Sequence, residues 1–371
     1  MRILHLADVH LDRPFVGLSR EAARQRRADL FDAFRRCLAA AAEQDVDAVT
    51  VGGDLWEDEN VTPDTRASVA HELEALDVPI LMVAGNHDPY LRGGAYERTN
   101  WPDNVTVVDS ASPRELRLGS PVSVWGASWT ERPLDARFLQ GCGPSGDART
   151  HLLLVHGTAR SDRSPFAATH CPFDPGEAKR AGFRLVLAGH IHAASVENDV
   201  VYPGSPEPLD HSEVGRHCYA LIDIEDGEVD ITLVDVNHRR QLLVEVDCSD
   251  AASSAEVEAR VREAIHLPED SSVVVTVRLY GDTAPECTID HSRLASRLEE
   301  DFVAAVVHDD TRPSVDVSAL ARRHTADGLF AAAMRDRIDQ ASDERERQVL
   351  EMALAAGVRA MSGEKDVLRV G

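Results

Sequence analysis

The stretch ILMVAGNHDPY, residues 80–90, is an apolar strand that runs directly into Gly85, Asn86, His87 and Asp88. Glycine, asparagine and aspartate tolerate left-handed backbone conformations and are typical of turns, but a turn gives no reason for the imidazole of His87. This strand therefore contributes to a site only if other strands are also followed by imidazole and other polar side chains.

Short apolar strands alternate with helical patterns on both sides of this stretch. Helices are expected at residues 19–44 and 62–76. The expected strands lie at residues 2–7, 47–53, 78–85, 122–129, 151–157, 183–192 and 200–205, followed by a hairpin at residues 218–236 that turns at Asp226 and Gly227. This rhythm predicts a layered α/β domain.

A second series of alternating strand and helix patterns begins after His238. Strands are expected at residues 241–247, 271–281 and 304–310, helices at residues 253–267 and 291–302, and two more helical stretches at residues 319–339 and 342–361. We therefore expect a first domain at residues 1–238, a second, smaller α/β domain at residues 239–340, and a C-terminal helical segment at residues 341–371.

Composition limits the classes of function. The chain has 371 residues, 43% of them hydrophobic, and neither a secretory leader nor an apolar run long enough to span a membrane, so we expect a cytoplasmic protein with no membrane partner. Its six cysteines form no C-x-x-C pair, which argues against a zinc ribbon or a disulfide framework. The formal charge of -25, with only Lys179 and Lys365 as lysines, suits a high-salt cytoplasm, although a GC-rich genome would also replace lysine by arginine. A nucleic-acid substrate would therefore need local positive charge.

Residues whose side chains can bind metal ions follow five of the expected strands. Since ligands bind outside the carboxyl ends of strands in open α/β sheets, side chains at these junctions should converge. The junctions are ADVH with Asp8 and His10, GGDL with Asp54, GNHD with Asn86 and His87, VHGT with His156, and GHIH with His190 and His192.

The residue types indicate which ions such a site would hold. Imidazoles mixed with carboxylate and carboxamide oxygens suit manganese, iron or zinc, whereas magnesium and calcium prefer oxygen alone. Seven ligands are too many for one ion, but two ions roughly 3.5–4 Å apart and bridged by Asp54 would use them all. Two divalent ions against the carboxylates of Asp8 and Asp54 leave a local charge of roughly +2, which meets the requirement for positive charge.

The order D-x-H, G-D, G-N-H-D, H and G-H-x-H resembles the calcineurin-like metallophosphoesterase superfamily over about residues 1–236. Within it, HLADVHLDRP and YPGSPEPLDHSE look like the DNA repair exonucleases of the SbcD type, nuclease subunits that pair with an SMC-like ATPase. The resemblance implies a β-sandwich flanked by helices, with residues 239–340 in the position of a DNA-capping domain.

The resemblance also implies residue roles. One of two divalent ions, expected to be Mn²⁺, would be held by Asp8, His10, Asp54 and His192, and the other by Asp54, Asn86, His156 and His190. His87 would be the catalytic histidine. GDLWEDEN departs from many relatives by placing Glu57 and Asp58 after the G-D motif, which leaves the role of this loop open.

The leading interpretation is a metal-dependent DNA exonuclease or endonuclease in double-strand break repair. A small-molecule or cyclic-nucleotide phosphoesterase is the alternative within the same class, and a non-catalytic scaffold is the alternative from another class. A protein phosphatase is disfavoured because GDLWEDE lacks a D-R-G sequence. Cleavage polarity, strand preference, the site of an ATPase partner and the oligomeric state, including a homodimer, stay open.

Two sets of residues outside the motifs have weaker interpretations. Basic residues that follow the motifs either contact the DNA backbone or are ordinary surface arginines; they are Arg13, Arg92, Arg160 and Arg163. The other eleven histidines, among them His5, are expected to be packing or surface residues.

Overall fold

The computed structural model describes residues 1–118, 122–131, 134, 137–144, 150–160, 171–210, 212–265, 273–314 and 316–361. The chain forms two compact units. The first comprises Met1–Leu243, Pro268–Thr276 and Ser296–Val306, and the second comprises Val244–Leu267, Val277–Ala295 and Val307–Gly371. Of the candidate arginines, Arg163 lies outside the described residues.

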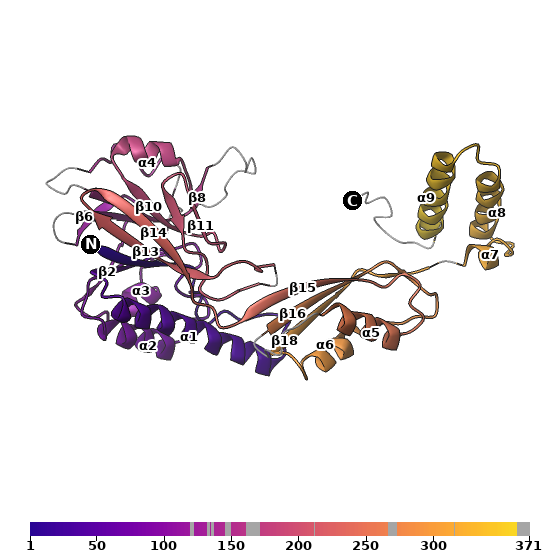
Figure 1. The fold of residues 1–371 in the computed structure, drawn as a ribbon, viewed down its shortest axis with the longest axis horizontal. Coiled ribbons are helices and arrows are strands. Elements are labelled where there is room, and N and C mark those ends of the chain that lie inside the picture. The colour runs from indigo at the N-terminus through magenta and orange to yellow at the C-terminus, as the bar shows by residue number, and fades with distance from the viewer. Residues whose placement is uncertain are drawn as a thin grey trace. The chain divides into compact units, whose positions relative to one another are not determined.

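The first unit contains two six-stranded sheets (Figure 1). In the first sheet, β1 to β4 are parallel, and the β13–β14 hairpin continues the sheet antiparallel to β1. Its strands, in spatial order, are β14 Glu228–Asp235, β13 Cys218–Glu225, β1 Arg2–Leu6, β2 Ala48–Val51, β3 Ile80–Met82 and β4 Val105–Val107.

The second sheet has a parallel centre and antiparallel edges. Strands β6, β7, β10 and β12 are parallel, whereas β5 and β11 pair antiparallel at the two ends. In spatial order its strands are β11 Ser195–Glu197, β12 Val200–Tyr202, β10 Leu185–Gly189, β7 Thr150–His156, β6 Val122–Ala127 and β5 Arg114–Arg117.

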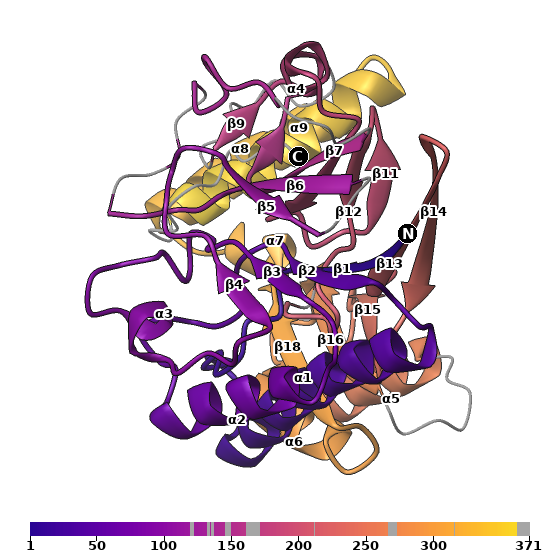
Figure 2. The same cartoon turned by 90° about the vertical axis from the view of Figure 1, so that its left-hand side faces the viewer.

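The two sheets pack face to face with helices outside them. Apolar residues from the facing sides, such as Ile3, Leu154 and Leu187, form one core. The outer face of the first sheet packs on α1 Arg20–Glu43, α2 Pro63–Glu74 and α3 Ala95–Arg98, and that of the second packs on α4 Pro175–Ala181. Figure 2 shows α1 and α2 beneath the first sheet and α4 above the second. This layered sandwich confirms the expected fold class.

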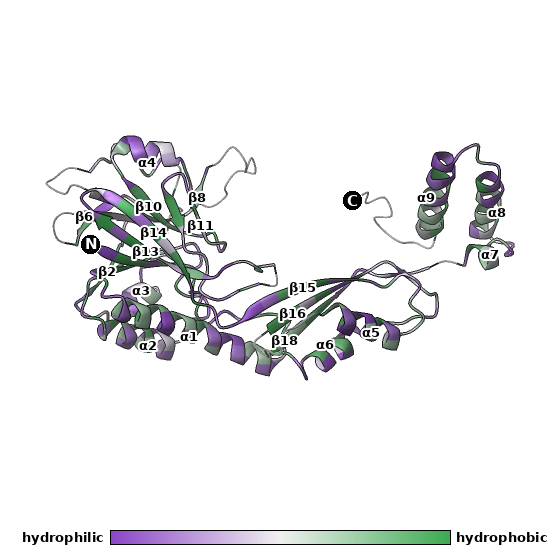
Figure 3. Ribbon diagram, viewed as in Figure 1, coloured by the Kyte–Doolittle hydropathy of each residue, from purple (hydrophilic) through white to green (hydrophobic). Residues whose placement is uncertain are grey.

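Helix α1 shows how the sequence pattern produces this packing. The Ser19 hydroxyl caps the helix by accepting a hydrogen bond from the Ala22 amide, and Leu30, Phe34 and Leu38 lie buried on one side, at helical spacing. Figure 3 shows α1 banded in purple and green, as expected for a helix with one polar and one apolar face. The buried side holds α1 against the first sheet.

The remaining elements follow β14. Strands β15 Arg240–Asp247, β16 Val273–Tyr280 and β18 Ala304–Asp309 form a three-stranded sheet in this order; α5 Ser254–Ala264 lies between β15 and β16 in the chain, and α6 His291–Leu298 lies between β16 and β18. The short strands β8 Thr158–Ala159 and β9 Pro172–Phe173 pair with each other, as do β17 Asp282–Thr283 and β19 Arg312–Pro313.

The C-terminal helices are α7 Val317–Leu320, α8 Ala326–Asp339 and α9 Glu344–Met361, which share one apolar cluster. The expected helix at residues 319–339 is therefore interrupted. Thr325, the N-cap of α8, has an extended backbone with φ -121° and ψ 164°, and this extended residue separates α8 from the helix before it. Within the described residues, no helix is long and apolar enough to cross a membrane.

Candidate metal centre

The sequence-predicted site residues lie at the carboxyl ends of five parallel strands, three from the first sheet and two from the second. The chain turns sharply after these strands. Asp8, His10, Asp54 and His190 have positive φ angles of 54°, 52°, 50° and 100°. Such conformations are uncommon for residues other than glycine and occur often at functional sites.

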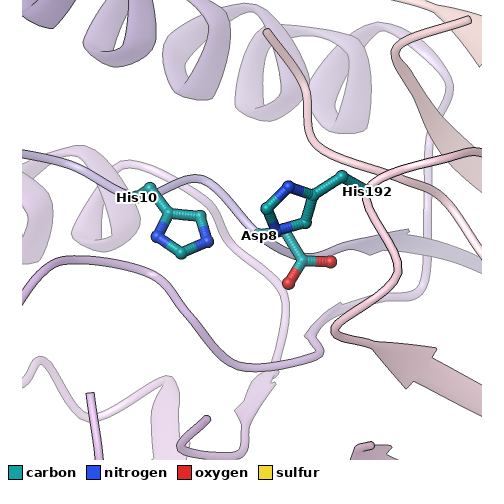
Figure 4. A group of neighbouring side chains, drawn as sticks. All are labelled: Asp8, His10 and His192. Atoms are coloured by element: carbon teal, nitrogen blue, oxygen red, sulfur yellow. The ribbon is translucent and has the colours of Figure 1, made fainter. Parts of the chain in front are cut away.

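His10 is oriented by a neighbour that the sequence patterns did not identify. Its Nδ1 lies 2.9 Å from Glu57 Oε1, and since a carboxylate only accepts, Nδ1 carries the proton. Its Nε2 is buried and has no hydrogen-bond partner among the described residues. In the neutral ring this orphaned nitrogen presents a lone pair toward Asp8 and His192, which lie close to His10 in Figure 4.

His192 is held in the same way. Its Nδ1 lies 2.7 Å from Glu213 Oε1, while Glu213 Oε2 accepts hydrogen bonds from the Ser205 hydroxyl and the Leu209 amide. The Glu213 carboxylate is thereby locked in place. This contact favours protonation at Nδ1 of His192 and leaves Nε2 available as a ligand.

His156 lies near the centre of the buried part of the site. Its Nδ1 donates to the carbonyl oxygen of Gly52 at 2.9 Å, and its Nε2 lies 3.0 Å from Asn86 Oδ1 and 3.2 Å from Asp54 Oδ2. Asp54 Oδ2 is also 3.5 Å from His10 Nε2. One carboxylate oxygen therefore faces ligand atoms on both sides of the site.

Asp8 and His190 connect the two sheets. Both carboxylate oxygens of Asp8 accept the His190 amide, at 2.9 and 3.0 Å, although Asp8 follows β1 and His190 follows β10. The His190 ring lies edge-on to the ring of His156, with centroids 5.2 Å apart. The structure thus brings all seven predicted ligand residues into one region.

The electrostatics of this region favour added positive charge. Burial alone would raise the pKa of Asp54, but the charges of His156 and His10 and a hydrogen bond from His156 lower it below the usual range. Burial alone would lower the pKa of His156, but Asp54 and Asp8 raise it to about 9. Burial raises the pKa of Asp8, and a cation next to Asp8 and Asp54 would offset the cost of burying both carboxylates in their charged form.

Three groups of carboxylate and imidazole side chains could each hold a metal ion, because their ligand atoms lie within 4.8 Å of one another. The orphaned Nε2 of His10 and the paired buried carboxylates fit a first-row divalent ion. The groups are Asp8 with His10 and His192, Asp8 with Asp54 and His156, and His10 with Glu57 and His87.

His87 lies at the exposed side of the site. Its amide donates to Asp54 Oδ1 at 2.9 Å, and its Nδ1 lies 2.9 Å from Glu57 Oε2. The hydrogen bond to Glu57 raises the pKa of His87, which burial would lower. Its ring stands edge-on to that of His10, with centroids 4.9 Å apart.

A buried carboxylate holds the turn that carries Asn86 and His87. Asp88 accepts hydrogen bonds from the amides of Gly85, Asp54 and Leu55, at 2.6, 3.1 and 2.6 Å, and from the Tyr96 hydroxyl at 2.7 Å. Burial raises the pKa of Asp88 to about 7. These bonds join the loop after β3 to the loop after β2.

Sequence reasoning missed the supporting roles of Glu57, Glu213 and Asp88. Asp88 belongs to the GNHD motif, and Glu57 lies three residues after Asp54 in the GDLWEDEN stretch. Glu213 is the last residue of YPGSPEPLDHSE, a stretch that supports the resemblance but in which no role is assigned to this residue. The candidate arginines Arg92 and Arg160 make no side-chain hydrogen bond or ion pair within the described part of the chain, whereas Arg13 contacts Glu57.

Comparison with known proteins adds independent information. Residues 1–194 match the family model of the calcineurin-like phosphoesterases. The chain is 27% identical over 301 residues to the uncharacterized metallophosphoesterase YhaO of Bacillus subtilis, across 77% of this chain and 73% of that protein. It is 30% identical over 322 residues to the DNA double-strand break repair protein Mre11 of Haloferax volcanii, across 83% and 67%. It is 28% identical over 277 residues to one component of the SbcCD nuclease of Escherichia coli, across 62% and 66%.

Proposed function

Because the chain belongs to the calcineurin-like phosphoesterase family, we propose that it is a phosphoesterase that hydrolyses the phosphodiester bonds of DNA during double-strand break repair. The similarity to the Mre11 protein of Haloferax volcanii extends over 83% of this chain, well beyond the residues that match the family model. This extent supports DNA over a small phosphoester as the substrate.

The observation that carries the proposal is the orientation of three imidazoles. His10, His156 and His192 each bond through Nδ1 to a group that can accept, which directs each Nε2 toward the region of Asp8, Asp54 and Asn86, where a metal would bind. A scaffold protein would have no use for this arrangement.

Two divalent ions, manganese in preference to magnesium, are assigned to these ligands. One ion is assigned to Asp8, His10, Asp54 and His192, and the other to Asp54, Asn86, His156 and His190. When bound, such a pair supplies an activated nucleophile and positive charge at the reacting phosphate.

His87 is assigned the proton transfer. Its Nδ1 is tied to Glu57, and its Nε2 has no partner among the described residues. The raised pKa of His87 favours the protonated ring, which can give its proton to the departing oxygen of the DNA backbone. Glu57 keeps this ring in place beside His10.

The substrate and the metal dependence are tested together by a gel assay. End-labelled single- and double-stranded DNA is incubated with the protein in manganese, magnesium or excess chelator. We expect cleavage in manganese, weaker cleavage in magnesium and none in chelator. Cleavage of bis-nitrophenyl phosphate without cleavage of DNA would indicate a small-molecule esterase instead. Absence of bound metal and of all cleavage would indicate a scaffold.

Residues 239–340 are assigned a DNA-capping role, and an SMC-like ATPase is the proposed partner. Arg239 forms two hydrogen bonds to Asp29, at 2.9 and 3.0 Å, so a truncated chain should retain this residue. A chain ending at Arg239 should lose duplex cleavage far more than hydrolysis of bis-nitrophenyl phosphate. Equal losses in a truncated chain that still melts cooperatively would contradict the capping role.

A further inference from the structure

One carboxylate organises the exposed side of the metal centre. Glu57 Oε1 lies 2.9 Å from His10 Nδ1 and 3.2 Å from Arg13 Nη1, while Oε2 lies 2.9 Å from His87 Nδ1. The His10 side chain is completely buried, whereas those of Arg13 and His87 are 27% and 44% exposed. Glu57 therefore holds Arg13 and His87 together where the site meets solvent.

Hydrogen bonds hold the backbone that carries Arg13. The Arg13 amide donates to the carbonyl oxygen of His10 at 3.2 Å, and the preceding residue, Asp12, accepts the Thr62 amide at 2.9 Å. The Arg13 guanidinium has five N–H donors. Among the described residues it makes one hydrogen bond, from Nη1 to Glu57. Several donors are left to bind a ligand beside His87.

We infer that Arg13 binds a non-bridging oxygen of the substrate phosphate next to His87, which makes it a phosphate-binding residue of this site. The inference rests on the proposed phosphodiesterase function and adds the residue that selects an anionic diester. A guanidinium presents paired donors that match phosphate oxygens. In a chain with a formal charge of -25, a fixed cation at this position also supplies the local attraction that a polyanion requires.

A purely structural role for Arg13 would be to neutralise Glu57. However, the Glu57 carboxylate already accepts hydrogen bonds from two imidazoles, one on each oxygen, so it has partners without Arg13. The two roles predict different kinetics. Loss of a phosphate contact raises KM, whereas loss of a neutralising charge alters the pH dependence governed by His87.

The kinetic test compares Arg13→Ala, Arg13→Lys and Arg114→Ala on bis-nitrophenyl phosphate in manganese. Arg114 is the control, because it also contacts one carboxylate, Asp109 at 2.7 Å, but lies on β5. We expect Arg13→Ala to raise KM about tenfold, the lower end of the value of a charge-assisted hydrogen bond. Lysine should restore part of the loss, and Arg114→Ala should match the wild type. An unchanged KM with a shifted pH profile would overturn the inference.

Binding provides a readout that does not depend on turnover. Fluorescence anisotropy of a labelled DNA duplex in excess chelator should show weaker binding by Arg13→Ala and a salt dependence reduced by about one phosphate contact. Wild-type protein that binds DNA but cleaves nothing in manganese would refute the proposed function while leaving this measurement valid. Equal affinity and equal salt dependence in wild type and Arg13→Ala would refute the role of Arg13.

Discussion

At the scale of single residues, Asn86 and His87 are neighbours on one turn with different surroundings. Asn86 Oδ1 lies 3.0 Å from His156 Nε2 in the buried part of the site, whereas the His87 ring is partly exposed and bonds to Glu57. Removal of a metal ligand lowers metal occupancy, whereas removal of a proton donor raises the barrier of the reaction. The two losses should therefore have different effects on the enzyme.

Substitutions of these two residues should therefore give separable defects. Asn86→Ala should lower bound metal and activity together. His87→Ala should keep its metal and DNA binding but lose roughly 10²–10⁴-fold in kcat, the usual value of a positioned proton donor. Metal analysis, melting temperature and single-turnover cleavage measure these effects, with His71→Ala on the exposed face of α2 as the control. Loss of metal from His87→Ala in proportion to activity would show that His87 only supports the turn.

His5 illustrates a histidine with a structural role. It is completely buried between the sheets, where Nδ1 contacts the Thr50 hydroxyl and Nε2 contacts the carbonyl oxygen of Ala188. Burial lowers the pKa of His5 from 6.5 to about 4, although hydrogen bonds to the backbone partly oppose the shift. The folded protein therefore excludes a proton that the unfolded chain binds.

This difference predicts a loss of stability in acid. As the pH falls from 6.5 to about 4, the unfolded chain takes up a proton at His5 and the folded protein does not, so the free energy of unfolding decreases by about 3 kcal/mol. Above pH 6.5 the contribution is constant. Denaturant unfolding at several pH values should show this slope in the wild type and a smaller slope in His5→Gln. Identical slopes would mean that His5 is protonated in the fold.

At the scale of elements, the strand ends depend on close approach between neighbouring loops. A Cβ atom on Gly85, just after β3, would lie 2.1 Å from Asp54 Oδ1 and 2.6 Å from the Asp54 amide nitrogen. A Cβ atom on Gly189, at the end of β10, would lie 2.2 Å from the carbonyl oxygen of Gly52. Only glycine allows these loops to pack this tightly around Asp54.

Gly85→Ala should therefore damage both the fold and the site. We expect a loss of about 1–3 kcal/mol in the free energy of unfolding, as for overpacking of a buried position, together with reduced metal content because Asp54 must move. Calorimetry and metal analysis measure both quantities. Gly215→Ala is the control, since a Cβ atom there meets no atom within 4 Å. A Gly85→Ala protein with normal stability and full metal content would contradict the close packing.

At the scale of the whole molecule, the formal charge of -25 opposes folding through self-repulsion. Screening shortens the reach of these charges from about 10 Å in 0.1 M salt to about 3 Å in 1 M salt. Exposed ion pairs such as Arg24 with Glu21 contribute little that salt could remove. Net repulsion should therefore dominate the response to salt.

The melting temperature should rise as KCl increases from 0.1 to 1 M. Sucrose at equal osmolarity is the control for effects that do not depend on charge. A flat or falling melting temperature would show that attractive ion pairs outweigh the repulsion. Affinity for DNA should change in the opposite direction, because salt weakens contacts with phosphates.

The sequence alone determined the layered α/β fold, through the alternation of apolar strands and amphipathic helices, and it grouped Asp8, Asp54, Asn86 and His156 because parallel strands place their carboxyl ends at one edge. Local patterns could not show the break between α7 and α8, nor the partners of each imidazole. Glu213 reaches His192 from 21 residues away, and Glu57 joins His10 to His87 and Arg13. Such hydrogen bonds depend on where separate loops meet in space, so only the tertiary structure decided them.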